Sequence, residues 1–351
     1  MTFATEFEIA GRRVGSGAPC YVIAEAGANH NGDLSIAKEL IDVAADAGAD
    51  AVKFQVYSGK KLYSSKTPRF DYLKDVDDQD TQKILADAEL PREWLPELAS
   101  YSAQRAITFF AAPFDHEAID ELDAVGVPVF KVANYELVDV HLIRAIAEKG
   151  RPTILSVGMA TYGEVEDALR AAEQGGATEV ALLRCAALYP APPRIMNLRA
   201  MATMRTAFGV PVGLSDHTEG IQVPLGAAGL GTDLLEKHFT LDRTMKGPDH
   251  PFAIEPGELR ALIAGIRDIE AAMGTGRLEG PSEEEAREMY TLARRSVVAA
   301  RDIAAGATIT RDDLTIKRPG YGIKPKDLDS VVGRVAKVEI PFDEIVTWDM
   351  V

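Results

Sequence analysis

The sequence predicts an α/β fold: a TIM (β/α)8 barrel followed by a small, mostly β domain. Short apolar runs alternate with helix-length segments, and eight such pairs follow one another before residue 274. Short apolar strands of this kind are typical of a parallel sheet buried on both faces. Eight strand–helix units indicate a closed barrel rather than an open sheet. The GxGxxG motif that marks a dinucleotide-binding sheet is absent.

The elements can be placed along the chain in order. A loosely alternating segment at 3–15, with a glycine turn at Gly11, predicts a small hairpin. The barrel strands are expected at 21–24, 51–55, 107–111, 129–132, 153–157, 180–184, 212–214 and 234–235. The helices are expected at 36–47 (capped at Ser35), 93–104, 117–125, 142–148, 163–174, 198–208, 221–231 and 256–273. A long polar insertion, 57–90, follows the second strand.

A change of composition after the last predicted helix divides the chain. The stretch 274–286, GTGRLEGPSEEEA, is rich in Gly, Pro and Glu and is typical of a linker. We therefore predict a barrel domain over 1–274, a linker over 275–290 and a separate domain over 291–351. That last domain is expected to contain short strands at 297–300, 308–309, 314–317 and 334–340.

Charge and composition exclude several classes of partner. The formal net charge is 38 − 54 = −16, which argues against nucleic acid or an anionic membrane surface as a partner. Cys20 and Cys185 lie in apolar runs, so we expect buried thiols rather than a disulfide or a metal motif. No signal peptide and no membrane-spanning apolar run is visible. We therefore expect a cytoplasmic protein.

Two histidines follow the last two predicted strands. Ser215-Asp216-His217 comes after 212–214, and Glu236-Lys237-His238 comes after 234–235. Because the carboxyl ends of neighbouring parallel strands lie side by side, His217 and His238 are expected to approach one point. The alternative is that each is a hydrogen-bonded structural residue. Two such histidines, with acidic residues nearby, favour a divalent metal site.

Two lysines lie inside otherwise apolar strands, at positions 53 and 131. A buried ammonium group must be paired. Each lysine could pair with a glutamate in a purely structural role. With Ser156 and Ser215 available as donors at other strand ends, we favour a site for an anion such as phosphate or carboxylate. The remaining candidate residues at strand ends are Glu25, Gln55, Phe114, Asn134, Glu136 and Tyr189.

The order of these motifs along the chain, and the residues within them, resemble the sialic acid synthase family over nearly the whole chain. The resemblance rests on AEAGANHNG, VKFQ, APF, KVANYE, LSVGMAT, LYPAPP, GLSDH, EKHFTLDR and GPDH, and on RRSVVAARDIAAGATI and IKRPGYGI near the end. Members of that family condense phosphoenolpyruvate with an amino sugar to make nonulosonic acids. The C-terminal segment is similar to the family's antifreeze-like (SAF) domain, a small β-clip fold.

The resemblance implies a role for each matching residue. His217 and His238 would hold a divalent metal, usually manganese, that polarises the sugar aldehyde. The residues that would contact phosphoenolpyruvate are Lys53, Lys131, Ser156, Ser215 and Tyr189. The residues that would surround the reacting carbons and the sugar are Glu25, Gln55, Phe114, Glu136 and Asp249. Glu25 or Glu136 would stabilise positive charge or activate water. Arg318 would reach the partner subunit's site in a domain-swapped homodimer.

Three positions depart from the family's pattern. Ala112 and Asn134 stand where a hydroxyl is common, and Ala187 stands where a polar residue is common. These departures predict an altered phosphate site or an altered sugar. They also leave two alternatives open: a metal-dependent aldolase or synthase that acts on a different sugar or aldehyde, and a non-catalytic binding protein.

Overall fold

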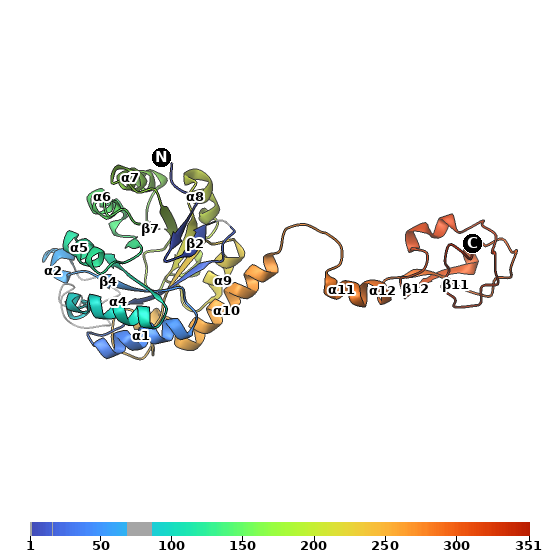
Figure 1. Cartoon of the computed structure of the whole chain (residues 1–351), viewed down its shortest axis with the longest axis horizontal. Coiled ribbons are helices and arrows are strands. Elements are labelled where there is room, and N and C mark those ends of the chain that lie inside the picture. Colours follow the sequence, from blue (N-terminus) through green and yellow to red (C-terminus); the bar gives the residue numbers. More distant parts are fainter. Residues whose placement is uncertain (1, 16, 69–85) are drawn as a thin grey trace. The chain divides into compact units, whose positions relative to one another are not determined.

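The computed structural model describes residues 2–15, 17–68 and 86–351 (Figure 1). It divides into two compact units, Met1–Gly274 and Thr275–Val351. The middle of the predicted polar insertion, residues 69–85, lies outside the described residues. Within the described part of the chain, no helix has the length and apolar character needed to cross a membrane.

The first unit is a parallel barrel, as predicted. Its eight strands hydrogen-bond in the order β5-β4-β3-β10-β9-β8-β7-β6. The two outermost strands of this order, β5 and β6, contact each other and close the sheet. The strands are β3 (Tyr21–Gly27), β4 (Ala51–Val56), β5 (Thr108–Pro113), β6 (Phe130–Val132), β7 (Thr153–Val157), β8 (Val180–Arg184), β9 (Val212–Asp216) and β10 (Leu234–His238). All their carboxyl ends therefore meet at one mouth of the barrel.

Helices surround the strands (Figure 1). The long ones are α1 (Leu34–Asp46), α4 (Leu95–Gln104), α5 (His116–Ala124), α6 (Val140–Ala147), α7 (Tyr162–Gln174), α8 (Ala200–Phe208), α9 (Gln222–Gly229) and α10 (Pro256–Met273). Shorter turns are α2 (Gly59–Leu62), η2 (Arg92–Trp94), η3 (Glu136–Val138), η4 (Pro193–Ile195) and η5 (His250–Phe252). The predicted N-terminal hairpin is confirmed: β1 (Glu6–Ile9) pairs antiparallel with β2 (Arg12–Gly15).

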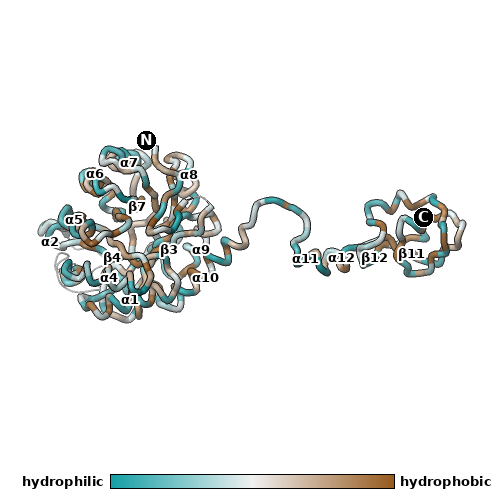
Figure 2. The backbone as a smooth tube through the Cα atoms, viewed as in Figure 1, coloured by the Kyte–Doolittle hydropathy of each residue, from teal (hydrophilic) through white to brown (hydrophobic). Residues whose placement is uncertain are grey.

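The core lies between the strands and the inner faces of the helices. Every residue of β3, β7, β9 and β10 is buried. Figure 2 shows hydrophobic segments along the central strands and hydrophilic stretches on the helices around them. Since apolar side chains fill both faces of the strands, the few charged residues within them need polar partners.

The start of α1 corrects the predicted N-cap. We predicted Ser35 as the cap of a helix beginning at 36, but the cap is Asp33, whose side chain accepts a hydrogen bond from the Ser35 backbone N–H. Both residue types are good caps. Asp33 also accepts from the Ser35 hydroxyl, at 2.6 Å, so the serine supports the cap instead of forming it.

The second unit has its own small core around a two-stranded antiparallel ribbon, β11 (Ser296–Ala299) and β12 (Leu314–Lys317). The runs predicted as strands at 308–309 and 334–340 contribute isolated bridges, such as Thr308 with Val335. The predicted linker contains helix α11 (Glu283–Arg287) and leads into α12 (Met289–Leu292). Ser282 and Glu285 form a capping box for α11, a signal that the composition of the segment obscured.

Candidate active site at the barrel mouth

A pocket lies at the carboxyl ends of the barrel strands. Six of the predicted site residues line it: Gln55, Phe114, Glu136, Tyr189, His238 and Asp249. Seven others are buried in the same unit and do not line it: Glu25, Lys53, Lys131, Asn134, Ser156, Ser215 and His217. Arg318 belongs to the second unit. Tyr57, Leu62, Tyr63 and Tyr135 also line the pocket, although the sequence interpretation assigned them no role.

The two histidines at the ends of β9 and β10 come together, with ring centroids 5.4 Å apart. The Nδ1 of His217 lies 2.7 Å from the carbonyl oxygen of Ala186. A carbonyl only accepts, so Nδ1 carries the proton and Nε2 keeps its lone pair. The Nδ1 of His238 is buried without a hydrogen-bond partner. Among the described residues, the hydrogen-bonding contact of His217 Nε2 is the weak donor Cys185 Sγ, 4.0 Å away, so this lone pair stays open to a metal ion. A neutral His238 likewise keeps one ring-nitrogen lone pair.

The surroundings keep both imidazoles neutral. Burial lowers the pKa of His217 to about 4 and lowers the pKa of His238 well below its usual value. Neutral imidazole is the form that binds metal ions. Among the described residues, no group of three His, Cys, Asp or Glu side chains is arranged to hold a metal ion. The donor set fits a two-histidine site whose other ligands would be water or substrate.

Asp249 approaches His238 from the loop after β10. Its Oδ2 accepts a hydrogen bond from the Ala28 backbone N–H at 3.2 Å and lies 3.7 Å from the Nδ1 of His238. Gly27 makes this approach possible: its φ is +52°, and a Cβ there would lie 2.5 Å from the same Oδ2. Burial raises the pKa of Asp249 to about 6.

Tyr189 packs against both histidines. Its ring centroid lies 4.2 Å from that of His217, at 30° between the planes, and 6.1 Å from that of His238. Phe252 packs against both Tyr189 and His238, with ring centroids 5.3 Å and 5.1 Å away. These ring contacts restrict the orientation of the imidazoles.

Lys53 is held between two buried carboxylates. Its Nζ lies 2.9 Å from the Oε2 of Glu25 and 3.5 Å from the Oε2 of Glu236. Gln55 donates to the other oxygen of Glu25 at 2.7 Å. Burial raises the pKa of Glu25, while the two lysines hold the pKa of Glu236 low despite its burial. For Lys53, the glutamate pairing that we had weighed as the alternative is present.

Lys131 is paired less completely. Its Nζ donates to the Ser156 Oγ at 2.7 Å and to the Val132 carbonyl at 2.8 Å. The nearest carboxylate oxygen, on Glu236, is 4.0 Å away. Among the described residues, the third ammonium hydrogen of Lys131 has no acceptor, and burial lowers the pKa of this lysine. The arrangement leaves one donor of a buried cation available to an anionic ligand.

Glu236 is a buried, charged residue of the site to which sequence reasoning assigned no role. Its Oε1 accepts a hydrogen bond from the Ser215 hydroxyl at 2.8 Å, and its Oε2 faces both lysines. One signal was available in the sequence. Glu236 lies two residues before His238 on the same strand, and residues two apart point to the same face of a sheet.

Glu136 differs from the other buried carboxylates. It begins η3 after β6, lines the pocket, and has a buried Oε2 without a hydrogen-bond partner. Burial raises its pKa to about 7. A carboxylate with an unused oxygen at a pocket wall, half ionised near neutral pH, is suited to general base or acid catalysis.

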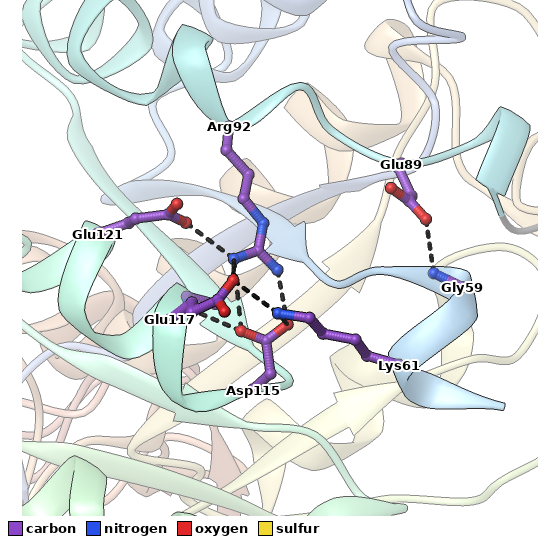
Figure 3. Close-up of polar contacts among 8 residues, drawn as sticks. Gly59, Lys61, Glu89, Arg92, Asp115, Glu117 and Glu121 are labelled. Atoms are coloured by element: carbon purple, nitrogen blue, oxygen red, sulfur yellow. Dashed lines mark hydrogen bonds and ion pairs between the residues drawn. The ribbon is translucent and has the colours of Figure 1, made fainter.

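An ionic cluster ties two walls of the pocket together (Figure 3). Arg92 binds Asp115 at 2.6 Å and Glu121 at 3.0 Å, and Lys61 binds Glu117 at 2.6 Å. Asp115 also caps α5 by accepting from the Ala118 backbone N–H. The cluster thus anchors α2, which carries the lining residue Leu62, to the start of α5, next to Phe114.

The three departures from the family pattern have different surroundings. Ala112 is buried in β5 beside Gln55. Ala187 offers its carbonyl to the Tyr135 hydroxyl at 3.1 Å. Asn134 keeps a polar group in the site, since its Oδ1 is buried without a partner and lies where a Cβ on Gly158 would be 2.9 Å away. Ala112 therefore brings no polar side-chain atom to the site.

Comparison with known proteins decides the family. The model of the NeuB family matches residues 40–278, and the model of the SAF domain matches residues 294–351. The chain belongs to the NeuB family. The second unit therefore carries the family's SAF domain, and the enzyme is of the sialic acid synthase type.

Relatives of this NeuB-family enzyme cover almost the whole chain. It is 40% identical over 329 residues to the N,N'-diacetyllegionaminic acid synthase of Campylobacter jejuni, covering 93% of this chain and 98% of the relative. It is 33% identical over 350 residues to mouse N-acetylneuraminate-9-phosphate synthase, covering 97% and 95%. The crystal structure of sialic acid synthetase from Leptospira borgpetersenii in complex with citrate matches with a TM-score of 0.73 at 34% identity, covering 82% of this chain and 96% of that one.

Proposed function

We propose that this enzyme condenses phosphoenolpyruvate with an amino-sugar aldehyde to give a nonulosonic acid and phosphate. The observation that carries the proposal is the convergence, at one barrel mouth, of two neutral histidines, a buried cation with an unused donor and a carboxylate with an unused oxygen. The reaction needs these three kinds of group. The histidines would bind the metal that activates the aldehyde, the lysine would bind the anionic phosphoenolpyruvate, and the carboxylate would act as the base. The products for which the relatives are named support the same reaction.

His217 and His238 would hold a divalent metal, with manganese the expected ion. When bound, the ion would polarise the aldehyde oxygen of the open-chain sugar as a Lewis acid. Tyr189 and Phe252 pack against the imidazoles, and the Ala186 carbonyl fixes the His217 tautomer. Asp249, next to His238, is placed to accept from a sugar hydroxyl.

Lys131 and Ser156 would bind phosphoenolpyruvate through its phosphate or carboxylate group. Carbon 3 of phosphoenolpyruvate attacks the aldehyde carbon, and positive charge develops at carbon 2. Water adds to carbon 2, and Glu136 is the carboxylate we assign to take its proton. The tetrahedral adduct then collapses by expelling phosphate. Glu25 is less suited to this step because Lys53 and Gln55 occupy both of its oxygens.

The two lysines are expected to respond differently to substitution. Lys131→Met should raise the KM for phosphoenolpyruvate roughly 10- to 100-fold, since a charge-assisted hydrogen bond contributes about 1.5–3 kcal/mol. Lys53→Met should instead lower the free energy of unfolding by about 3–5 kcal/mol, because buried Glu25 would lose its ion pair and Glu236 would keep only Lys131, 4.0 Å away. Steady-state kinetics and denaturant unfolding separate the two outcomes. An unchanged KM in Lys131→Met would assign that lysine a structural role.

The acceptor sugar is the finer part of the proposal. Aromatic and apolar side chains line the pocket at Tyr57, Leu62, Phe114 and Tyr135. They favour a 2,4-diacetamido hexose over N-acetylmannosamine, because the second acetamido methyl group replaces a hydrated hydroxyl. Phosphate release should be measured with phosphoenolpyruvate and each sugar in turn. A kcat/KM higher for N-acetylmannosamine would overturn this preference, and no release with any six-carbon amino sugar would overturn the proposed reaction.

We also propose a homodimer in which Arg318 of the SAF domain completes the partner's sugar site. If so, Arg318→Ala and His217→Ala proteins, each inactive alone, should regain activity when mixed under conditions in which subunits exchange. The mixed dimer then combines both defects in one site and leaves the other site intact. Exchange confirmed by mass spectrometry without recovered activity would contradict the swap.

A further inference from the structure

A buried ion pair lies next to both candidate metal ligands without touching the pocket. The Nζ of Lys237 lies 2.7 Å from the Oδ2 of Asp216, and both side chains are almost completely buried. Lys237 also donates to the Thr218 carbonyl. Asp216 in turn accepts from the Thr218 hydroxyl at 3.0 Å and from the Thr218 backbone N–H at 3.2 Å. The two side chains therefore find their polar partners in each other and in Thr218, in the turn that follows β9.

The position of the pair in the barrel is specific. Asp216 and Lys237 are direct partners in the register of β9 and β10. Each immediately precedes a histidine, His217 or His238. Because successive residues of a strand point to opposite faces, the pair lies on the other face from the site residues Ser215 and Glu236. The ion pair joins the ends of β9 and β10 one residue before each histidine.

Stability alone is a weak reason for such a pair. Removing two charges from water is costly, and replacing a buried ion pair by apolar residues of similar volume is often neutral or stabilising. What an ion pair supplies, and apolar side chains do not, is a directional contact that fixes one geometry. Here that geometry is the separation of the two strand ends and the conformation of the His217-Thr218 turn.

We propose that Asp216 and Lys237 are positioning residues that hold His217 and His238 at the spacing needed to bind one metal ion. This inference rests on the proposed metal site. Neither residue contacts substrate or metal; both act through the backbone of the adjacent histidine. Loss of the pair lets the two imidazoles move independently, so metal affinity falls even where the barrel remains folded. Partners that orient metal ligands typically affect metal affinity 10- to 100-fold.

The test uses three variants of the full-length enzyme: Asp216→Asn, Lys237→Met and the double variant Asp216→Leu/Lys237→Met. Manganese affinity of the metal-free proteins is measured by the loss of the free-ion electron paramagnetic resonance signal, and thermal unfolding is followed in parallel. We expect each variant to bind manganese at least about tenfold more weakly than the unmodified enzyme. The double variant leaves no buried charge unpaired. It should also bind manganese more weakly, but its unfolding temperature should lie within a few degrees of that of the unmodified enzyme.

Asp233→Asn provides a matched control. Asp233 also links β9 to β10, accepting from the Val212 backbone N–H and from Arg205, each at 2.8 Å, but at the opposite end of the same two strands. Its loss should lower the unfolding temperature and leave manganese affinity unchanged. If the double variant binds manganese as tightly as the unmodified enzyme, the positioning role is wrong. If the unmodified enzyme and the Asp233→Asn variant fail to bind manganese, the metal site itself is wrong.

Discussion

His217→Ala and His238→Ala should each lower turnover by about three orders of magnitude, because polarisation of the aldehyde by a bound ion contributes several kcal/mol to the transition state. Each variant should also lose manganese binding, since two imidazoles supply all the protein donors that we assign. Chelation of the unmodified enzyme should give the same loss of turnover, and added manganese should restore it. Turnover is measured as phosphate release, and metal content is measured on the purified proteins.

His141→Ala is the control for these substitutions. His141 is an exposed residue of α6 and does not line the pocket, so its removal should change neither metal content nor turnover. The imidazoles of His217 and His238 are buried, and their removal leaves cavities, so unfolding must be measured for each variant. Folded His217→Ala and His238→Ala enzymes with full turnover would refute the metal assignment.

Glu136→Gln should lower kcat by roughly 10²- to 10⁴-fold, the range for loss of a general base. Since burial raises the pKa of Glu136 to about 7, the carboxylate is ionised above that pH and protonated below it. A base must be ionised to act. The kcat/KM of the unmodified enzyme should therefore fall about tenfold per pH unit as the pH drops below 7, and this acid limb should be absent from the variant.

Glu25→Gln is the informative comparison for Glu136→Gln. Glu25 is paired with Lys53, so its neutralisation leaves Lys53 with Glu236 alone. The main expected effect of Glu25→Gln is therefore a lower free energy of unfolding, not a loss of proton transfer. An acid limb that survives in Glu136→Gln and vanishes in Glu25→Gln would transfer the role of base to Glu25. Retention of full kcat in both variants would exclude either carboxylate from the step.

The periodicity of the sequence was sufficient to predict the barrel. The strands at 153–157 and 180–184 and the helix at 256–273 have the bounds that the pattern indicated. The first residue of a helix was harder to predict, because two nearby residues can both serve as caps, as with Asp33 and Ser35. The helix α11 was hidden within a composition typical of linkers, although its Ser282–Glu285 capping box could be read from the residues alone.

The residues of the site could be predicted from strand ends, but their pairing could not. Strand alternation places Glu25, Lys53 and His238 at the barrel mouth, yet the match of Lys53 with Glu25 follows from the register of β3 with β4. Register within a parallel barrel is set by packing around the whole closed sheet, which no local pattern reveals. Likewise, the pairing of Asp216 with Lys237 depends on the alignment of β9 with β10.

In the reaction that we propose, the enzyme joins phosphoenolpyruvate to an amino sugar and releases phosphate. The most direct measurement supplies the metal-loaded enzyme with a 2,4-diacetamido hexose and either phosphoenolpyruvate or pyruvate, and counts phosphate released against sugar consumed. We expect one phosphate per sugar consumed, no reaction with pyruvate, and a product whose mass equals sugar plus phosphoenolpyruvate plus water minus phosphoric acid. Consumption of the sugar with pyruvate, without phosphate release, would contradict the proposed reaction and identify an aldolase.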